Sequence, residues 1–280
     1  KMSHRFHLVS GVALSVFLLP TAGLADENVI NYLNTGYNAF NANQSGTGNA
    51  IDPAQQYGDN NSANVTQQGD YNLVTFQQGL DATTPAFGNA IEVFQSGTEN
   101  YGDILQTGEN NRASIGQEMD GNTAQINQLG LGGDAEVGQT GFYNQTTVHQ
   151  DGDFDIVRTN VFGDENTVEI HQVDFANDSP NMIDTSTEGE FNYTRIYQET
   201  ADGAMGHTFE MNQMGYGNTV EITQLQGGNT GMVFQDSAEG SITLLQDGYD
   251  NYASISQYGI GNIAAIEQIG DGGNTTIQQY

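Results

Sequence analysis

The sequence has no cysteine and no tryptophan, only four prolines, and five basic residues against 35 acidic ones, which gives a formal net charge of −30. Without cysteine, an exported chain must be stabilised by packing and hydrogen bonds rather than by crosslinks. The excess of carboxylates repels phosphate groups, so we expect no nucleic-acid partner. Hydrophobic residues amount to 36%, which argues against a thick apolar core and leaves disorder or a repeat array as the alternatives.

Residues 1–25 differ in composition from the rest of the chain. A basic start precedes an apolar run from Val9 to Leu19, and a small-residue site at 23–25 follows, immediately before Asp26. This pattern predicts a secretory signal peptide that is cleaved before Asp26. The run is too short for a membrane span, and no later segment is apolar enough, so we expect no membrane span in the mature chain. The predicted mature chain keeps three basic residues, namely Arg112, Arg158 and Arg195.

The rest of the chain repeats with a period of 11 residues. The segment 111–117 recurs at 122–128, 251–257 and 262–268. The same frame gives 21 units over residues 38–280, which begin at positions 38, 49, 61, 72, 89, 100, 111, 122, 133, 144, 155, 166, 181, 192, 207, 218, 229, 240, 251, 262 and 273. Asparagine opens 16 units, and glutamine stands six residues after the start in 19, failing only at Val161 and Thr187. This regularity excludes disorder as the main interpretation.

Each unit has the pattern of one strand and one tight turn. The second and fourth positions after each start carry no charged residue, whereas charges occur at the first, third and fifth, which is the alternation of a strand with one buried face. Glycine eight residues after the start, followed by Asn, Asp or Gly, predicts the turn. We therefore predict an all-β fold, a β-solenoid with two strands per 22-residue coil and about ten coils, stacked at roughly 4.8 Å.

The recurring amides are predicted to face inward and to stack in ladders. An unpaired buried amide costs roughly 1–3 kcal/mol, but stacked amides satisfy each other from coil to coil. The ladder also fixes the register, because a slip by one residue would exchange the amides for charged outer residues. The predicted ladder residues are Asn100, Gln106, Asn111, Gln117, Asn122, Gln128, Asn144, Gln150, Asn218, Gln224, Asn251, Gln257, Asn262, Gln268 and Gln279. The gaps at Val161 and Thr187 fall in succession on one face and predict a weak point in that column.

Stacking also predicts an outer ladder of charges, because units two apart share a face. One face carries Glu136, Arg158 and Asp184 in succession, and the other carries Glu169, Arg195 and Glu221. Each arginine lies between acids in this order, and Arg112 has Asp134 next on its face. Exposed pairs of this kind contribute about 0.2–1 kcal/mol each.

Four features depart from the regular pattern. Pro53 falls on a predicted inward position and lacks an N–H, so we expect an irregular coil there. The segment 80–88 contains a six-residue insertion, and four-residue insertions precede Asn181 and His207. We expect these insertions to bulge from turns and to leave the stacked columns intact.

We expect no catalytic, cofactor-binding or metal-binding residues. A hydrolase or lyase solenoid needs longer coils that form a cleft, and the acids here stand at solvent-facing positions. His149 and His171 are expected to stack on one face. The favoured interpretation is that they are surface residues brought together by the repeat without a role in metal binding. Asp151, Asp153 and Asp155 have a calcium-like spacing without a downstream bidentate glutamate, so we interpret them as solvated turn acids. Calcium-binding nine-residue rolls and ice-binding threonine arrays do not fit the pattern.

The repeat resembles that of the curlins, the subunits of bacterial curli amyloid fibres. The segment 251–262 matches the family pattern of Asn, alternating small or aliphatic residues, Gln and a Gly-Asn turn, and residues 278–280 are similar to the Gln-Tyr ending of major curlin subunits. The resemblance covers residues 38–280. Residues 26–37 stand where the family keeps an export-targeting segment, and they are either that segment or a degenerate repeat that begins at Asn28.

The resemblance implies a non-enzymatic, secreted fibre subunit that contributes to biofilm matrix and surface adhesion. The implied partners are other copies of the chain, a nucleator subunit and an outer-membrane secretion channel, and the implied location is an extracellular fibre on the bacterial cell surface, reached through the periplasm. The segment 273–279 reads as a regular strand without a cap, so we expect end-to-end addition there. A nucleator subunit and a non-polymerising cell-surface adhesin or cation-binding solenoid remain open alternatives.

Overall fold

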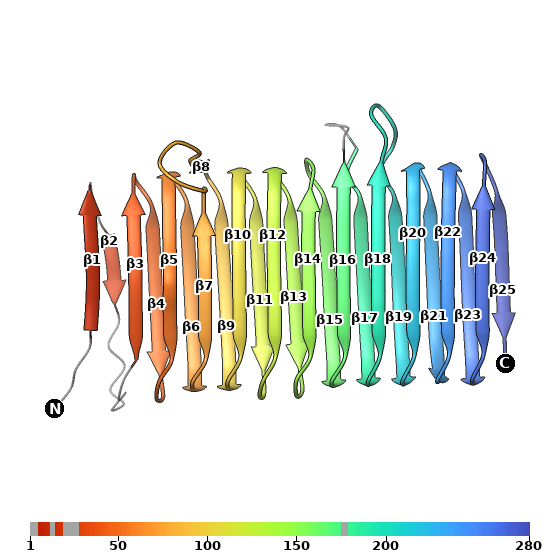
Figure 1. Ribbon diagram of the computed structural model, residues 1–280, viewed down its shortest axis with the longest axis horizontal. Coiled ribbons are helices and arrows are strands. Elements are labelled where there is room, and N and C mark those ends of the chain that lie inside the picture. Colours follow the sequence, from red (N-terminus) through yellow and green to blue (C-terminus); the bar gives the residue numbers. More distant parts are fainter. Residues whose placement is uncertain (1–4, 12–14, 19–27, 175–178) are drawn as a thin grey trace. The chain divides into compact units, whose positions relative to one another are not determined.

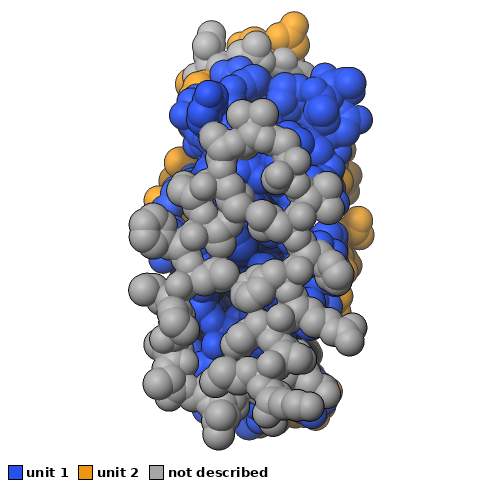
Figure 2. Space-filling model, turned by 90° about the vertical axis from the view of Figure 1, so that its left-hand side faces the viewer, with its two compact units in different colours: residues 1–143 blue, residues 144–280 orange. Residues whose placement is uncertain are grey.

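The computed structural model describes residues 5–11, 15–18, 28–174 and 179–280 (Figure 1). All regular secondary structure in these segments is β-strand, and they contain no helix that could span a membrane. The chain forms two compact units, residues 1–143 and residues 144–280 (Figure 2).

Unit 1 consists of two parallel sheets whose strands alternate along the chain (Figure 1). The first sheet contains, in spatial order, β1 (Arg5–Gly11), β3 (Val29–Thr35), β5 (Ala50–Asp59), β7 (Leu73–Gln78), β10 (Tyr101–Glu109) and β12 (Thr123–Leu131), with β8 (Ala86–Phe87) beside β5 and β10. The second contains β2 (Ser15–Leu18), β4 (Ala39–Ser45), β6 (Ser62–Asp70), β9 (Ala90–Thr98), β11 (Arg112–Glu118) and β13 (Asp134–Thr140).

Unit 2 repeats this arrangement with six strands in each sheet. The first sheet contains β14 (Gln145–Asp151), β16 (Thr167–Asp174), β18 (Tyr193–Thr200), β20 (Thr219–Gly227), β22 (Ser241–Tyr249) and β24 (Ile263–Ile269). The second contains β15 (Ile156–Asp164), β17 (Met182–Glu190), β19 (Thr208–Tyr216), β21 (Thr230–Ala238), β23 (Tyr252–Ile260) and β25 (Asn274–Gln279).

Neighbouring strands pair in the register that the repeat predicts. In β10 and β12, Ile104 lies opposite Ile126 and Gln106 opposite Gln128, a separation of 22 residues. Both strands show the same alternation of buried and partly exposed side chains, so the core of each unit lies between its two sheets. These observations confirm the predicted all-β solenoid with two strands per coil.

Successive coils approach each other closely at turns where glycine stands eight residues after the unit start. Gly108 has φ +89°, and a Cβ atom there would lie 2.0 Å from the carbonyl oxygen of Gly130 in the next coil. No side chain fits such an approach, so glycine is required. Another left-handed turn position holds Tyr143, with φ 57°, whose ring covers Gly121 so closely that a Cβ there would lie 2.5 Å from it.

The first coils include residues of the segment 1–25, which the sequence pattern assigns to a signal peptide. β1 pairs with β3 and β2 pairs with β4, both in parallel. The predicted cleavage site lies outside the described residues, and the signal peptide stays a prediction. Asn28 is buried and accepts a hydrogen bond from the backbone N–H of Asn49 at 2.8 Å, as the opening asparagine of a unit does elsewhere.

The prediction that Pro53 points inward is wrong. The pairing of β5 with β7 shifts by one residue between Ile51 and Ala54, and this bulge leaves Pro53 exposed. The shift moves the inward amide of this coil from Gln55 to Gln56, which is fully buried. The bulge therefore accommodates both the missing N–H of proline and the extra residue of this 12-residue unit.

The insertion at 80–88 does more than bulge from a turn. β7 ends early, at Gln78, and the inserted segment returns as β8, where Phe87 pairs with Asp59 on one side and with Glu109 on the other. β8 thus takes the place of the missing end of β7 between β5 and β10, and the stacked side-chain columns continue on both sides of the insertion. The insertion before His207 forms a loop at 201–206, whereas the one before Asn181 lies partly outside the described residues.

Candidate functional site

The glutamines six residues after each unit start form continuous ladders inside unit 1. In the first sheet, Gln78 Nε2 donates to Gln106 Oε1 at 3.0 Å, and Gln106 Nε2 donates to Gln128 Oε1 at 2.8 Å. In the second, Gln95 donates to Gln117 at 2.8 Å, which donates onward to Gln139. These six side chains are at most 1% exposed. Each coil therefore contributes two buried amides bonded to the coils beside it.

The second N–H of each glutamine amide links the two sheets. Gln106 Nε2 also donates to the carbonyl oxygen of Ala90 in β9 at 3.1 Å, and Gln128 Nε2 donates to that of Arg112 in β11 at 2.9 Å. Each amide thus makes three hydrogen bonds. Within the column its oxygen accepts one and one N–H donates another, and its second N–H donates across the core. Because every polar atom is paired, its burial carries no unsatisfied desolvation cost.

Unit 2 contains equivalent glutamine ladders. In the first sheet the donors and acceptors follow one another from coil to coil at 2.7–3.0 Å through Gln150, Gln172, Gln198, Gln224, Gln246 and Gln268. In the second sheet the column runs through Gln213, Gln235, Gln257 and Gln279 at 2.6–3.0 Å.

The asparagines that open the units form a second kind of ladder at the turns. The backbone N–H of Asn122 donates to Oδ1 of Asn100 at 3.0 Å, and the same bond recurs between Asn166 and Asn144. The Nδ2 of Asn122 donates to the carbonyl oxygens of Glu118 and Gly141. Equivalent bonds hold Asn111, Asn218 and Asn251, whereas the Nδ2 of Asn262 donates to Tyr258 O.

The gap in the glutamine column of unit 2 contains buried hydroxyl groups in place of amides. Val161 and Thr187 are fully buried, and the Thr187 Oγ1 has no hydrogen-bond partner. The hydroxyls of Thr159 and Thr185 are likewise buried without a partner. The column restarts at Gln213, whose Oε1 accepts a bond from the Thr194 hydroxyl at 3.0 Å. The gap thus lies beside three buried hydroxyl groups that make no hydrogen bond.

Replacing Thr187 by valine should stabilise unit 2 by about 1 kcal/mol, because the change removes a buried hydroxyl that makes no hydrogen bond. The matched control is Thr194→Val, which removes a hydroxyl that bonds to Gln213 and should destabilise by about 1–2 kcal/mol. Urea unfolding midpoints of the two variants should shift in opposite directions. A loss of stability in Thr187→Val would show that its hydroxyl is satisfied.

Five of the described units open with a residue other than asparagine, and in two of them, at His207 and Asp155, the side chain still accepts the ladder bond. His207 is buried, and its Nδ1 accepts from the N–H of Asn229 at 3.3 Å while its Nε2 bonds the Glu199 carbonyl at 3.0 Å. Burial lowers the pKa of His207, so the ring is neutral near pH 7.

Asp155 was expected to be a solvated turn acid, and this prediction is wrong. Its side chain is fully buried in the asparagine ladder, where Oδ1 accepts from the backbone N–H of Asn181 at 2.9 Å and Oδ2 has no partner. Burial raises the pKa of Asp155 to about 7, and the nearby carboxylates of Asp174 and Asp153 act in the same direction. The repeat frame offered the signal, since residue 155 opens a unit.

The predicted outer charges lie next to each other in the sheets of unit 2 without close ion pairs. Arg195 stands between Glu169 and Glu221 in the register, and Arg158 stands opposite Asp184. Among the described residues neither arginine has a carboxylate within 4 Å, and Glu169 instead accepts from the Tyr193 hydroxyl at 3.1 Å. In unit 1, Arg112 does approach Asp134 at 3.6 Å, and Glu136 is exposed on the same strand. Arg158 and Arg195 therefore lie beside acids without pairing closely with them, whereas Arg112 forms an ion pair with Asp134.

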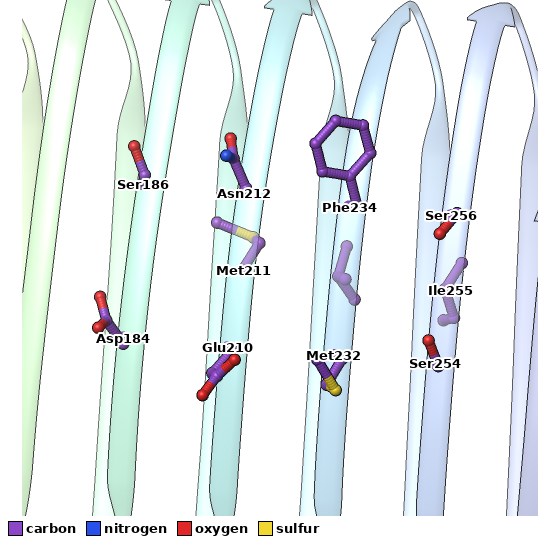
Figure 3. Close-up of a pocket in the computed structure, with 11 residues that line it drawn as sticks. Asp184, Ser186, Glu210, Met211, Asn212, Met232, Phe234, Ser254, Ile255 and Ser256 are labelled. Carbon is purple, nitrogen blue, oxygen red and sulfur yellow. The ribbon is translucent and has the colours of Figure 1, made fainter.

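A shallow hollow lies on the outer face of β17, β19, β21 and β23 (Figure 3). It forms where the small side chains of Ser186, Ser254 and Ser256 lie beside the larger Met232 and Phe234. Its lining contains no histidine, lysine or cysteine, so its serines have no such base beside them. The hollow therefore results from the difference in size between neighbouring side chains on the sheet surface.

The fold and the ladders define the chain as a two-sided parallel β-solenoid of 11-residue repeats. The family model described as the curlin associated repeat matches residues 88–118, 97–130, 241–270 and 248–280, which lie in both units. The chain therefore carries curlin associated repeats in both of its units, and both the repeat and the fold are of a structural rather than an enzymatic kind. A comparison with curated proteins finds no match.

Proposed function

We infer that the protein is a structural subunit of an extracellular curli-like amyloid fibre that assembles end to end. The curlin associated repeats support this function, since the subunits of curli fibres are built from such repeats. The fold supports it as well, because stacked parallel strands perpendicular to a long axis are the architecture of cross-β fibres.

The observation that carries the proposal is the single direction of the glutamine ladders. In both units, every glutamine-to-glutamine bond described above runs from the Nε2 of the earlier residue to the Oε1 of the later one, as from Gln78 to Gln106 and from Gln224 to Gln246. A coil of a second molecule can continue such a ladder only head to tail. Head-to-tail contacts that repeat along the stacking direction of the coils do not close into a ring and therefore lead to filaments.

The proposed location and partners follow from the same role. We propose export by the predicted signal peptide and an outer-membrane channel, initiation by a nucleator subunit, and a role in biofilm matrix and surface adhesion. The acidic surface is expected to slow association by mutual repulsion, so salt should accelerate growth.

Seeded growth tests the proposal directly. We expect the purified protein to elongate preformed seeds with thioflavin binding and to give fibres with a cross-β reflection at about 4.7–4.8 Å. The matched control is Gln224→Glu, which interrupts one ladder and should elongate the same seeds far more slowly. A protein that stays monomeric after prolonged seeding at high concentration would favour the non-polymerising adhesin instead.

A further inference from the structure

Two histidines of unit 2 lie side by side on the outer face of one sheet. β14 and β16 pair in parallel with His149 opposite His171, and their ring centroids are 4.4 Å apart with the planes inclined by 45°. The spacing follows that of the strands, roughly 4.8 Å, so the backbone itself holds the rings together. The next residue in this outer column is Tyr197, whose ring centroid lies 5.8 Å from that of His171.

Both rings are free to bind a ligand. Among the described residues neither His149 nor His171 makes a hydrogen bond, and His149 is half-buried while His171 is exposed. His207 differs in this respect, because it is buried and both of its ring nitrogens are occupied. The stacked pair therefore presents unoccupied imidazole nitrogens at the surface.

The local electrostatics keep these nitrogens available near pH 7. Desolvation lowers the pKa of His149, and desolvation and then the neighbouring His149 ring lower that of His171. A metal ion binds the neutral imidazole, so depressed values favour binding. The carboxylate of Asp151 acts on both rings in the direction that favours a cation, and Arg195 opposes it at His171.

We propose that His149 and His171 form a binding site for a first-row divalent transition metal ion such as Cu²⁺, Ni²⁺ or Zn²⁺. Imidazole nitrogen suits these ions, whereas Ca²⁺ and Mg²⁺ prefer oxygen ligands. No group of three or more His, Cys, Asp or Glu within the described segments could hold a metal. The two imidazoles are therefore the principal protein ligands, water completes the coordination, and the ion exchanges readily. This role is independent of fibre formation.

Titration of the full chain with Cu²⁺ tests the site, because electron paramagnetic resonance reports how many nitrogens coordinate the ion. We expect one equivalent with the signature of two imidazole nitrogens. His149→Asn or His171→Asn should weaken binding by about tenfold or more and reduce the signature to one nitrogen, since the second ligand on a rigid sheet acts at high effective concentration. His4 and His7 remain in every variant, so any contribution from them is common to all.

His207→Asn is the matched control, because asparagine stands at this position in the neighbouring coils and the variant should bind Cu²⁺ unchanged. Tyr197→His tests the site by adding a ligand instead of removing one. It extends the stacked column to a third imidazole and should tighten Cu²⁺ binding by about tenfold. Circular dichroism of each variant checks that the β-structure is retained. Unchanged affinity and spectrum in the His149→Asn/His171→Asn double variant, or no gain in Tyr197→His, would overturn the proposal.

Discussion

Replacing Asp155 by asparagine should stabilise the protein by about 4 kcal/mol at pH 8 and leave its stability nearly unchanged at pH 4. In the regular units the ladder asparagine donates from Nδ2 to carbonyl oxygens, as Asn166 does to Phe162 and Gly189. Asp155 places Oδ2, which is buried and unpartnered, where those units have a donor. An ionised carboxylate there would face oxygen atoms without compensation, and asparagine restores the donor.

The sign of the pH dependence follows from the folded pKa of about 7 against an ordinary value of 3.8. Below pH 4 the group is protonated in both states and imposes no penalty. Between pH 4 and 7 unfolding releases a proton, so the stability of the protein falls by about 1.4 kcal/mol per pH unit. Above pH 7 the loss is complete and amounts to about 4 kcal/mol.

Urea unfolding at pH 4, 6 and 8 measures this difference between the natural protein and Asp155→Asn. The matched control is Asp184→Asn, an exposed acid on the neighbouring strand β17, which should give nearly parallel profiles with at most a small constant offset. Equal pH profiles for Asp155→Asn and the natural protein would mean that Asp155 is solvated or paired with a cation.

Replacing Gln224 by glutamate should destabilise the protein by about 3–5 kcal/mol at pH 7. The Gln224 amide accepts from Gln198 at 2.7 Å and donates to Gln246 at 2.8 Å and to the Thr208 carbonyl at 3.4 Å. Glutamate keeps the acceptor but loses both donors, and it buries a charge against two oxygen atoms. Protonation at low pH supplies one donor again, so the deficit should shrink towards pH 4.

Thr223→Glu is the matched control for this variant. It places the same charge one residue away, on the outer face of the same strand β20, where water solvates it. We expect a change below about 1 kcal/mol there, measured by the same urea titrations. Similar losses at positions 223 and 224 would mean that the two side chains do not face opposite sides of the sheet.

The sequence predicts most of this fold because local pattern and long-range contact share one period. Two 11-residue units separate Gln106 from Gln128 in the sequence, and the same 22-residue separation pairs β10 with β12. Alternation within a unit determines which side chains face inward, so the core residues follow once the unit start is known. The structure differs from the prediction where an individual residue or an insertion interrupts the repeat.

Three departures have identifiable causes. The doublet of Gln55 and Gln56 offers two amides for one inward position, and only the bulge at Pro53 decides between them. β8 could not be predicted, because its two residues pair with strands on both sides only after β7 has ended. Asp155 was misread because the spacing of neighbouring acids suggested a turn, although its place in the repeat frame implied burial.

Hydrogen exchange of glutamine side-chain amides, followed by nuclear magnetic resonance, tests the account most directly. Gln67 and Gln68 are neighbours in β6, yet Gln67 is fully buried in the ladder between Gln44 and Gln95, whereas Gln68 is exposed. The account predicts that the Gln67 amide exchanges orders of magnitude more slowly than the Gln68 amide. Equal and rapid exchange of the two would contradict the stacked interior on which the fold and the proposed fibre depend.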